Sequence, residues 1–243
     1  MRKLFPLTYT GFKYSKRDSP SNKFMRAHQT KNSLINKVYN KIIRPILPTK
    51  IAVYNGVAVK REAKLLDIND VFSDYKAPNA KALRNEVRRS DDVIVIGGGV
   101  GVTSIVAARN IDSGNVVLVY EASEQNFKKT QENISINEVD DRCQVKHAIV
   151  GSVNPDIVGL GTPEKITAQS LSDCDVLEMD CEGSELNIIK NLQIGPRTII
   201  VETHPKFGSP TNEVENELSS KGYIISNKVT DPVDGHVLTA KLK

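Results

Sequence analysis

Runs of apolar residues alternate with polar and amphipathic segments over the second half of the chain. Four of these runs are dominated by aliphatic residues, and continuous runs of this kind are typical of strands buried on both faces of a sheet. They cover residues 93–96, 115–120, 175–180 and 198–202. Helical segments are expected over residues 103–111, 123–137, 184–192 and 211–221. This alternation predicts an α/β fold with a doubly wound, mostly parallel sheet.

The last part of the sequence departs from the parallel pattern. A short strand over residues 143–149 extends the predicted sheet, whereas the strands 223–227 and 236–241 are joined by only about eight residues. A parallel crossover needs a dozen or more residues. One of these two strands must therefore run antiparallel, an arrangement that dinucleotide dehydrogenases lack.

The segment before residue 78 lies outside this alternation. Residues 50–67 predict a β-hairpin, because Asn55 and Gly56 supply the positive φ angles of a two-residue turn. A helix over residues 78–89 then leads into the first buried strand. We therefore divide the chain into three parts: a basic extension over residues 1–50, partly disordered or helical, a hairpin and connecting segment over 51–77, and the main domain over 78–243.

Charge distinguishes the extension from the rest of the chain. Residues 1–50 hold 12 Lys and Arg and one acid, Asp18, which gives +11, whereas the remainder holds 21 bases and 28 acids, which gives −7. Residues 33–46 place four apolar side chains along one helical stripe beside basic residues, which fits either a membrane-surface helix or a helix that caps the main domain. We expect this extension to make a peripheral contact with an anionic membrane surface.

Cysteine content and hydropathy bound the location of the protein. The three cysteines are scattered and lack metal-ligand spacing, which suggests reduced thiols, and no run approaches the roughly 18 apolar residues of a membrane span. We expect a cytoplasmic protein whose contact with a membrane is at most peripheral. No RNA-binding module precedes the core, so no nucleic-acid partner is expected.

The first buried strand is followed directly by four glycines: Gly97, Gly98, Gly99 and Gly101. Thr103 is expected to cap the next helix, and the second strand ends at a single carboxylate, Glu121. A strand, a glycine turn, a helix, a strand and an acid form the layout of a nucleoside-binding unit, in which the acid accepts from ribose hydroxyls. The Gly-x-Gly-x-Gly spacing favours S-adenosylmethionine (SAM) over a dinucleotide. Ala122, His147 and Ala148 are expected to line the adenine pocket.

A second candidate site follows the strand 175–180. Ligands of such sheets bind at the carboxyl ends of the strands, so Asp180 and Glu182 should face the same crevice as the glycines. Carboxylates before a helix can merely complement its dipole, an explanation that suits Glu185. An acid that ends a buried strand is costly without a partner, which favours a function for Asp180.

His204 is the candidate general base. It follows the strand that ends at Glu202, and a histidine with an ordinary pKa of about 6.5 is largely neutral at pH 7. The alternative is a loop histidine that caps a turn before Pro205. A metal ion could bind where Asp180, Glu182, Glu202 and His204 converge, but no spacing requires one, and none is assigned.

Three stretches of the sequence resemble one family of enzymes. DVLEMDCEGSELNIIKNL is similar to the hallmark of the FkbM methyltransferases, Asp-x-Glu-Gly-[Ala/Ser]-Glu before a helix, while VYEASEQNFKKTQENISIN and TIIVETHP resemble two further elements of that family. The resemblance covers about residues 90–227. It implies a Rossmann-like class I methyltransferase fold, SAM as the cofactor and a hydroxyl acceptor on a sugar, glycan or natural product.

The resemblance also assigns residues to roles. It places Gly97, Gly99 and Gly101 on the SAM loop, Glu121 on the ribose acid, and Asp180, Glu182 and Glu185 on the hallmark. The chain departs from the usual pattern at Val95, where methyltransferases commonly carry an acid. Two alternatives stay open: a NAD-dependent oxidoreductase, and a non-catalytic module that binds SAM or another nucleoside.

Overall fold

A computed structural model describes residues 48–62, 69–151, 161–231 and 235–243. The predicted extension over residues 1–50 and its possible helix therefore lie almost entirely outside the described residues. Within the described parts of the chain, no helix is long and apolar enough to cross a membrane.

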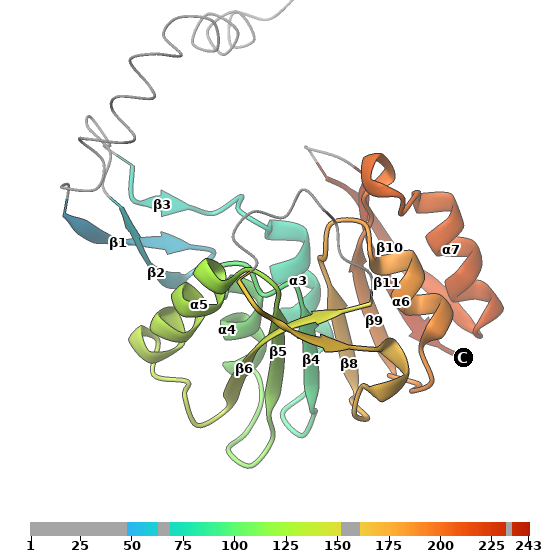
Figure 1. Cartoon of the computed structure of the whole chain (residues 1–243), viewed down its shortest axis with the longest axis horizontal. Helices are drawn as coiled ribbons and strands as arrows, with labels where there is room; N and C mark the ends of the chain where they lie inside the picture. Colours follow the sequence, from blue (N-terminus) through green and yellow to red (C-terminus); the bar gives the residue numbers. More distant parts are fainter. Residues whose placement is uncertain (1–47, 63–68, 152–160, 232–234) are drawn as a thin grey trace, which may run out of the picture. The chain divides into compact units, whose positions relative to one another are not determined.

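The central feature is a sheet of eight strands in the order β10-β11-β9-β8-β4-β5-β6-β7 (Figure 1). Its strands in chain order are β4 (Val93–Ile96), β5 (Val117–Glu121), β6 (Cys143–Val150), β7 (Glu164–Ile166), β8 (Val176–Met179), β9 (Thr198–Glu202), β10 (Tyr223–Thr230) and β11 (His236–Leu242). Strands β4 to β9 pair in parallel, whereas β11 pairs antiparallel with both β9 and β10. The predicted α/β class and its antiparallel end are confirmed.

Helices cover both faces of this sheet because successive residues of its buried strands point to opposite sides. Val93 and Val95 pack in a core with the helices α3 (Ala77–Glu86), α4 (Val102–Ala108) and α5 (Glu124–Ile136). Ile94 and Ile96 pack in a second core with α6 (Glu185–Asn191) and α7 (Thr211–Ser220). The four residues of β4 are all buried, as the continuous apolar run predicted.

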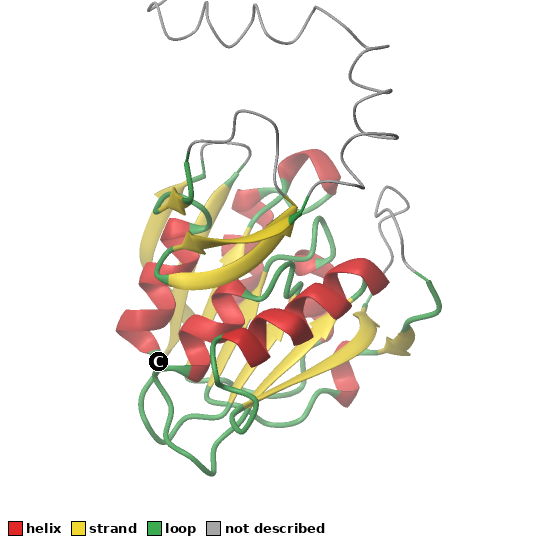
Figure 2. Cartoon of the chain, turned by 90° about the vertical axis from the view of Figure 1, so that its left-hand side faces the viewer, coloured by secondary structure: helices red, strands yellow, loops and turns green. Residues whose placement is uncertain are grey.

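A second sheet has three strands, β2 (Val57–Glu62), β1 (Thr49–Tyr54) and β3 (Val71–Phe72). The predicted hairpin forms β1 and β2, and Asn55 and Gly56 take φ angles of 50° and 81° in its turn. Its β2 strand packs on α5, where the Asn133 side chain accepts from the backbone of Lys60. This sheet is drawn apart from the central strands in Figure 2, and the segment after β3 runs from it to α3.

Some local predictions differ from the structure. Thr103 does not cap α4: the cap position is Gly101, with φ 89°, and Thr103 lies inside the helix and is buried. The reason is that the tight glycine turn enters the helix two residues earlier than expected. The short strand β7 was not predicted from the sequence, and residues 152–160 before it lie outside the described residues.

Candidate active site

The glycine turn after β4 brings two loops into direct contact. Gly97 has φ 89°, and a Cβ on it would lie 1.9 Å from the carbonyl oxygen of Asp180. Gly101 also has φ 89° and packs against Thr130 of α5. Only glycine permits both this backbone conformation and this approach. The turn therefore lies directly beside the loop that follows β8.

Glu121 ends β5 and holds the glycine turn through its side chain. Its Oε2 accepts from the backbone N–H of Gly99 at 2.7 Å, and its Oε1 accepts from the N–H of Ser123 at 2.8 Å. Burial raises the pKa of Glu121, and these two hydrogen bonds partly offset that effect. The predicted ribose acid thus lies at the predicted loop, with its carboxylate fixed by two backbone amides.

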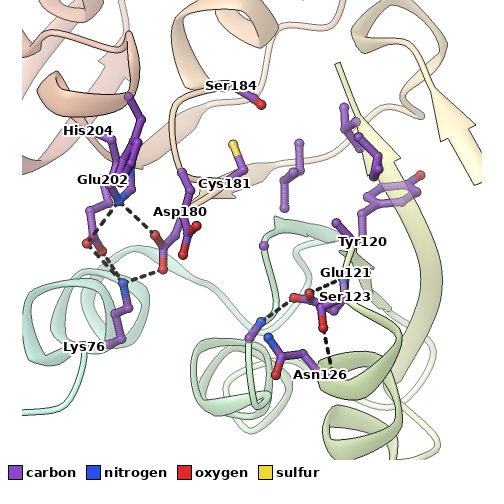
Figure 3. Close-up of a pocket in the computed structure, with 18 of the residues that line it drawn as sticks. Lys76, Tyr120, Glu121, Ser123, Asn126, Asp180, Cys181, Ser184, Glu202 and His204 are labelled. Atoms are coloured by element: carbon purple, nitrogen blue, oxygen red, sulfur yellow. Dashed lines mark hydrogen bonds and ion pairs between the residues drawn. The ribbon is translucent and has the colours of Figure 1, made fainter. Parts of the chain in front are cut away.

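A cluster of charged side chains lies at the carboxyl ends of β8 and β9 (Figure 3). The Lys76 Nζ lies 2.5 Å from Oδ2 of Asp180 and 2.9 and 3.1 Å from the two carboxylate oxygens of Glu202. The His204 Nε2 lies 3.6 Å from Asp180 Oδ1 and 3.7 Å from Glu202 Oε1. Two cationic groups therefore face the same two carboxylates. We call Lys76, Asp180, Glu202 and His204 the charge cluster.

Glu185 holds the loop between β8 and α6 in place through hydrogen bonds to its backbone. It is fully buried at the first position of α6, where its carboxylate accepts from the backbone N–H groups of Cys181 and Gly183 at 3.0 and 2.9 Å. The same carboxylate is paired with Nδ1 of His204 at 2.8 Å. Hydrogen bonds and the charge of His204 lower the pKa of Glu185 despite its burial. Glu185 therefore orients His204 in addition to starting the helix.

The charge of His204 differs from the sequence-based expectation. Burial alone would lower the pKa of His204, but the hydrogen bond and charge of Glu185, together with Asp180 and Glu202, raise it to about 9. His204 is consequently protonated at pH 7 and has no free lone pair with which to act as a general base. The ordinary pKa assumed from the sequence is wrong because three carboxylates surround the ring.

The pKa values of Glu202 and Lys76 are shifted as well. Burial and the neighbouring charge of Asp180 raise the pKa of Glu202, and Lys76 partly offsets this. The two carboxylates raise the pKa of Lys76 in spite of its burial, so its ammonium stays charged. With Glu185 included, three carboxylates face two cations, and the group as a whole carries one net negative charge.

Three members of the charge cluster have the chemistry of a metal site. Asp180, Glu202 and His204 each offer one ligand atom, and these atoms lie within 4.8 Å of one another. Carboxylate and imidazole ligands of this kind suit several divalent ions. Glu182, which the sequence grouped with them, is not part of this set. Lys76 contacts two of the three residues.

One cavity of about 700 Å³ joins the glycine turn to the charge cluster, a size in the usual range for small-molecule sites. Of the predicted site residues, its lining includes Gly97, Gly99, Glu121, Ala122, Ala148, Asp180, Glu182 and His204. Figure 3 shows the charge cluster on the left of the drawn side chains and Glu121 to its right, beside Ser123 and Asn126. The cavity thus brings most of the two predicted motifs together.

Three predicted cofactor residues do not line this cavity. Gly98 and Gly101 pack against neighbouring elements instead. A Cβ on Gly98 would lie 2.5 Å from the Val119 side chain. His147 faces α5: its ring stacks on Phe127, and its Nε2 lies 3.1 Å from the carbonyl oxygen of Ala122. The expectation that His147 lines the adenine pocket is therefore wrong, because its strand turns that side chain toward the helix.

Sequence reasoning missed the lining residues that precede α3. Asp74, Tyr75 and Lys76 all line the cavity, although they come from the connecting segment rather than from the predicted main domain. Lys76 is the cap residue of α3, with φ 50°, and Pro78 fixes the first turn of that helix. Pro78 signalled the start of the helix, but no local pattern showed that the preceding lysine reaches β8 and β9.

Comparison with known families finds a match over part of the chain. Residues 163–225 match the family model of the methyltransferase FkbM domain. The match includes the loop between β8 and α6, β9 and His204, and it confirms the FkbM resemblance for this part of the chain. The match spans 63 of the 243 residues, and over this part the chain is similar to the FkbM methyltransferase domain, a family whose cofactor is SAM. No curated protein sequence matches the chain.

Solved structures agree with the fold. TYW2 from P. horikoshii, in complex with MeSAdo, is 18% identical with a TM-score of 0.52, over 79% of this chain and 70% of that chain. Trm5b from Pyrococcus abyssi is 14% identical with a TM-score of 0.52, over 81% of this chain and 56% of that chain. At these identities the likeness shows the Rossmann-like fold and carries no information on the substrate.

Proposed function

We propose that this protein is a SAM-dependent O-methyltransferase that acts on a hydroxyl group of a sugar, glycan or natural product. One observation carries the proposal: a single cavity connects the glycine turn and Glu121 with a cluster of carboxylates at the ends of β8 and β9. The glycine turn with Glu121 suits a nucleoside. The carboxylate cluster suits a neutral acceptor that must lose a proton.

The residues at the glycine end fit SAM. Gly99 has open space where a Cβ would lie, so a ligand can approach the backbone there. Glu121 keeps acceptor capacity for a ribose hydroxyl, because a carboxylate has about four lone-pair sites. Backbone amides use two of them, and the side chain of Asn126 makes a further hydrogen bond. Ala122, Ala148 and Ile149 supply an apolar wall for adenine. When bound, SAM supplies a methyl group that its sulfonium has already activated.

The residues at the other end fit a hydroxyl acceptor. Asp180 and Glu202 offer carboxylate oxygens, while Tyr75 and Phe207 offer aromatic surface to the same cavity. Carboxylates and aromatic rings together suit a polyhydroxylated ring, whose hydroxyls donate and whose C–H faces pack on apolar groups. These features support a sugar-like acceptor.

The chain's own residues account for the proton of the acceptor. We assign it to Glu202 of the Asp180–Glu202 pair, because burial and the charge of Asp180 raise the pKa of Glu202. One proton neutralises the single net negative charge of these carboxylates and cations. His204, held by Glu185, keeps its proton and orients the pair. The cavity walls align the acceptor, an effect that can contribute about 7–11 kcal/mol.

A methyl-transfer assay tests the proposal. Purified protein is incubated with SAM and a panel of sugars and glycosides, and S-adenosylhomocysteine (SAH) and the methylated product are measured by mass spectrometry. Glu202→Gln, which keeps the shape of the side chain, should lower turnover about 10²–10⁴-fold with nearly unchanged SAM affinity. The exposed Glu213 on α7 provides the control variant Glu213→Gln. Wild-type turnover in Glu202→Gln would show that another residue acts as the base.

The same preparation addresses the two alternatives. Calorimetric titration with SAM and with NAD distinguishes a methyltransferase from an oxidoreductase, since only the correct cofactor should bind tightly. A protein that binds SAM but forms no SAH with any acceptor would support the non-catalytic module instead.

A further inference from the structure

The backbone at Lys76 is held in place by neighbouring elements. It lies between β3 and α3 with φ 50°, and its carbonyl oxygen accepts from the N–H of Ala80. On one side, Tyr75 packs edge-on against Tyr54 of β1. On the other, Asn79 donates to the buried Glu178 of β8 at 3.0 Å. The lysine stem therefore starts from a position that two elements determine.

The ammonium of Lys76 makes three contacts of hydrogen-bond length. They are the contacts with Asp180 at 2.5 Å and with the two oxygens of Glu202 at 2.9 and 3.1 Å. An ammonium has three N–H donors and no acceptor, so these contacts match its donors in number. Its side chain is only 27% exposed, which removes much of the solvent that would otherwise screen the two carboxylates from each other.

The same carboxylates belong to the set of residues with metal-ligand geometry. Asp180, Glu202 and His204 place one ligand atom each within 4.8 Å of the others, and an ion among them would bind the oxygens that Lys76 holds. A divalent ion and an ammonium cannot occupy this place together, because they compete for the same lone pairs and repel each other. The position between Asp180 and Glu202 can therefore hold either the ammonium of Lys76 or a divalent ion, but not both.

We propose that Lys76 is the resident cation of the acceptor site: its ammonium takes the place of a divalent ion between Asp180 and Glu202. This inference rests on the proposed function, because it concerns the carboxylates assigned to the acceptor. Lys76 acts through those carboxylates and is a positioning residue. It bridges the two carboxylates at close range and fixes the direction in which their remaining lone pairs point.

The alternative is an ion pair that only stabilises the fold. A buried ion pair is weak evidence for stability, because desolvation offsets much of its attraction. A purely structural ion pair also needs no second cation, yet His204 faces the same two carboxylates from the other side. The pairing of two cations with two carboxylates at a cavity wall therefore favours a role in the site.

Binding of Mn²⁺ tests the proposal directly, without SAM or acceptor. Full-length protein is titrated with MnCl₂, and bound ion is measured by calorimetry and electron paramagnetic resonance. Wild-type protein should bind no Mn²⁺ at this position. Lys76→Ala should gain one Mn²⁺ site, and the double variant Lys76→Ala with Asp180→Asn should lose it. The exposed Lys81 of α3 provides the control, and Lys81→Ala should behave as wild type.

Turnover gives the second readout. Lys76→Met, which keeps the length of the side chain and removes its charge, should lower turnover about 10²-fold. Lys76→Arg should retain more activity than Lys76→Met, because it restores the charge. In Lys76→Ala, added Mn²⁺ or Mg²⁺ should recover part of the lost turnover, whereas wild-type turnover should not respond to chelator.

Three results would overturn the proposal. One is a Mn²⁺ site in wild-type protein that Asp180→Asn abolishes, because the resident cation would then be a metal ion. Another is a Lys76→Ala protein that folds but gains no Mn²⁺ site. The third is wild-type turnover in Lys76→Met. Since Mn²⁺ binding is measured without methyl transfer, these results are distinguishable from a failure of the proposed O-methyltransferase activity.

Discussion

The carboxylate of Glu121 joins the shape of a loop to the binding of a ligand. Its two oxygens accept from the amides of Gly99 and Ser123, so the glycine turn is held in place before any nucleoside enters. The same oxygens are those that would face the ribose. Removal of this side chain should therefore affect both the turn and the ligand.

The first prediction concerns this residue. Glu121→Ala should weaken SAM binding by about 1–3 kcal/mol, because it leaves polar partners without an acceptor. Glu121→Gln keeps one carbonyl oxygen and should lose less. Isothermal titration calorimetry with SAM measures both variants, and the heat-capacity change shows whether the turn is still ordered. Unchanged affinity in Glu121→Ala would show that the ribose is held elsewhere.

The second prediction concerns the pH dependence of stability. The pKa of His204 is raised from 6.5 to about 9 in the folded protein, so the folded state binds its proton more tightly than the unfolded state does. The stabilisation is complete below about pH 6.5 and is lost as the pH rises through about 9. The difference in the free energy of unfolding between wild type and His204→Gln should therefore shrink between pH 6.5 and 9.

Urea unfolding at a series of pH values measures this difference. Glu185→Gln is the matched variant, since it removes the partner that contributes most to the raised pKa of His204 and should reduce the same pH dependence. A constant difference between wild type and His204→Gln across this range would contradict the assigned charge of the histidine.

At the scale of elements, α3 connects the site to the core. Asn79 and Glu178 are both buried, and Asn79 Nδ2 donates to Glu178 Oε1 at 3.0 Å. Among the described residues, the other two polar atoms of this pair, Asn79 Oδ1 and Glu178 Oε2, have no hydrogen-bond partner. A proton on Glu178 Oε2 would let the acid donate to the amide oxygen. The pair then ties α3, and with it Lys76, to β8.

The third prediction follows from this pair. Burial, and next the charge of Asp180, raise the pKa of Glu178 from 4.5 to about 8. The folded state therefore binds more protons than the unfolded state between these values, and Glu178 makes stability fall as the pH rises from 4.5 toward 8. Glu178→Gln, whose amide can donate without ionising, should reduce this slope and be at least as stable as wild type at pH 8.

Thermal unfolding between pH 5 and 8.5 measures the slope. Glu178→Ala is the comparison, because it leaves a cavity and removes the tie to α3, and it should be less stable than wild type throughout. An unchanged slope in Glu178→Gln would mean that Glu178 does not titrate in this range.

The sequence could predict the elements whose signal is local. The apolar runs of β4, β8 and β9 and the Asn55-Gly56 turn were sufficient to place strands, and the count of residues between β10 and β11 required an antiparallel pair. The strands β3 and β7 have two and three residues, which is too short for any periodicity. Thr103 was misplaced because a serine or threonine near a helix start does not by itself fix the cap.

The site was predictable only as far as its residues follow strand ends. Asp180, Glu121 and His204 lie where the parallel sheet places its carboxyl ends, and they reach one cavity. Lys76 comes from the other side of that cavity and from a segment more than 100 residues earlier than Asp180. Its contact with Asp180, like the raised pKa of His204, depends on tertiary packing that no local pattern encodes. Val95 stands where methyltransferases commonly carry an acid. In the sheet, Val95 pairs in register with Glu178 of β8.

At the scale of the whole molecule, charge is distributed unevenly along the chain. The fourth prediction is that the full chain binds anionic lipid vesicles and that a protein of residues 48–243 does not. Residues 1–50 carry +11 and the remainder −7, and each basic residue near an anionic surface contributes about 1 kcal/mol. Binding should fall steeply with added salt.

Co-sedimentation with vesicles that contain phosphatidylserine measures this binding, and vesicles of phosphatidylcholine alone serve as the control. SAM affinity should be the same for both proteins, because the described cavity lies within residues 48–243. Equal vesicle binding by the shortened protein would exclude the basic segment as the membrane contact.

The order of strands has a consequence for how the protein is made. β11 follows β10 in the chain but lies between β9 and β10 in the sheet. Until residues 236–242 have left the ribosome and paired, β9 has an open edge and β10 lacks its neighbour in the sheet. Open edges of this kind readily pair with other chains. The nascent protein should therefore be most prone to aggregate immediately before its sheet closes, and this is the stage at which a chaperone would protect it most effectively.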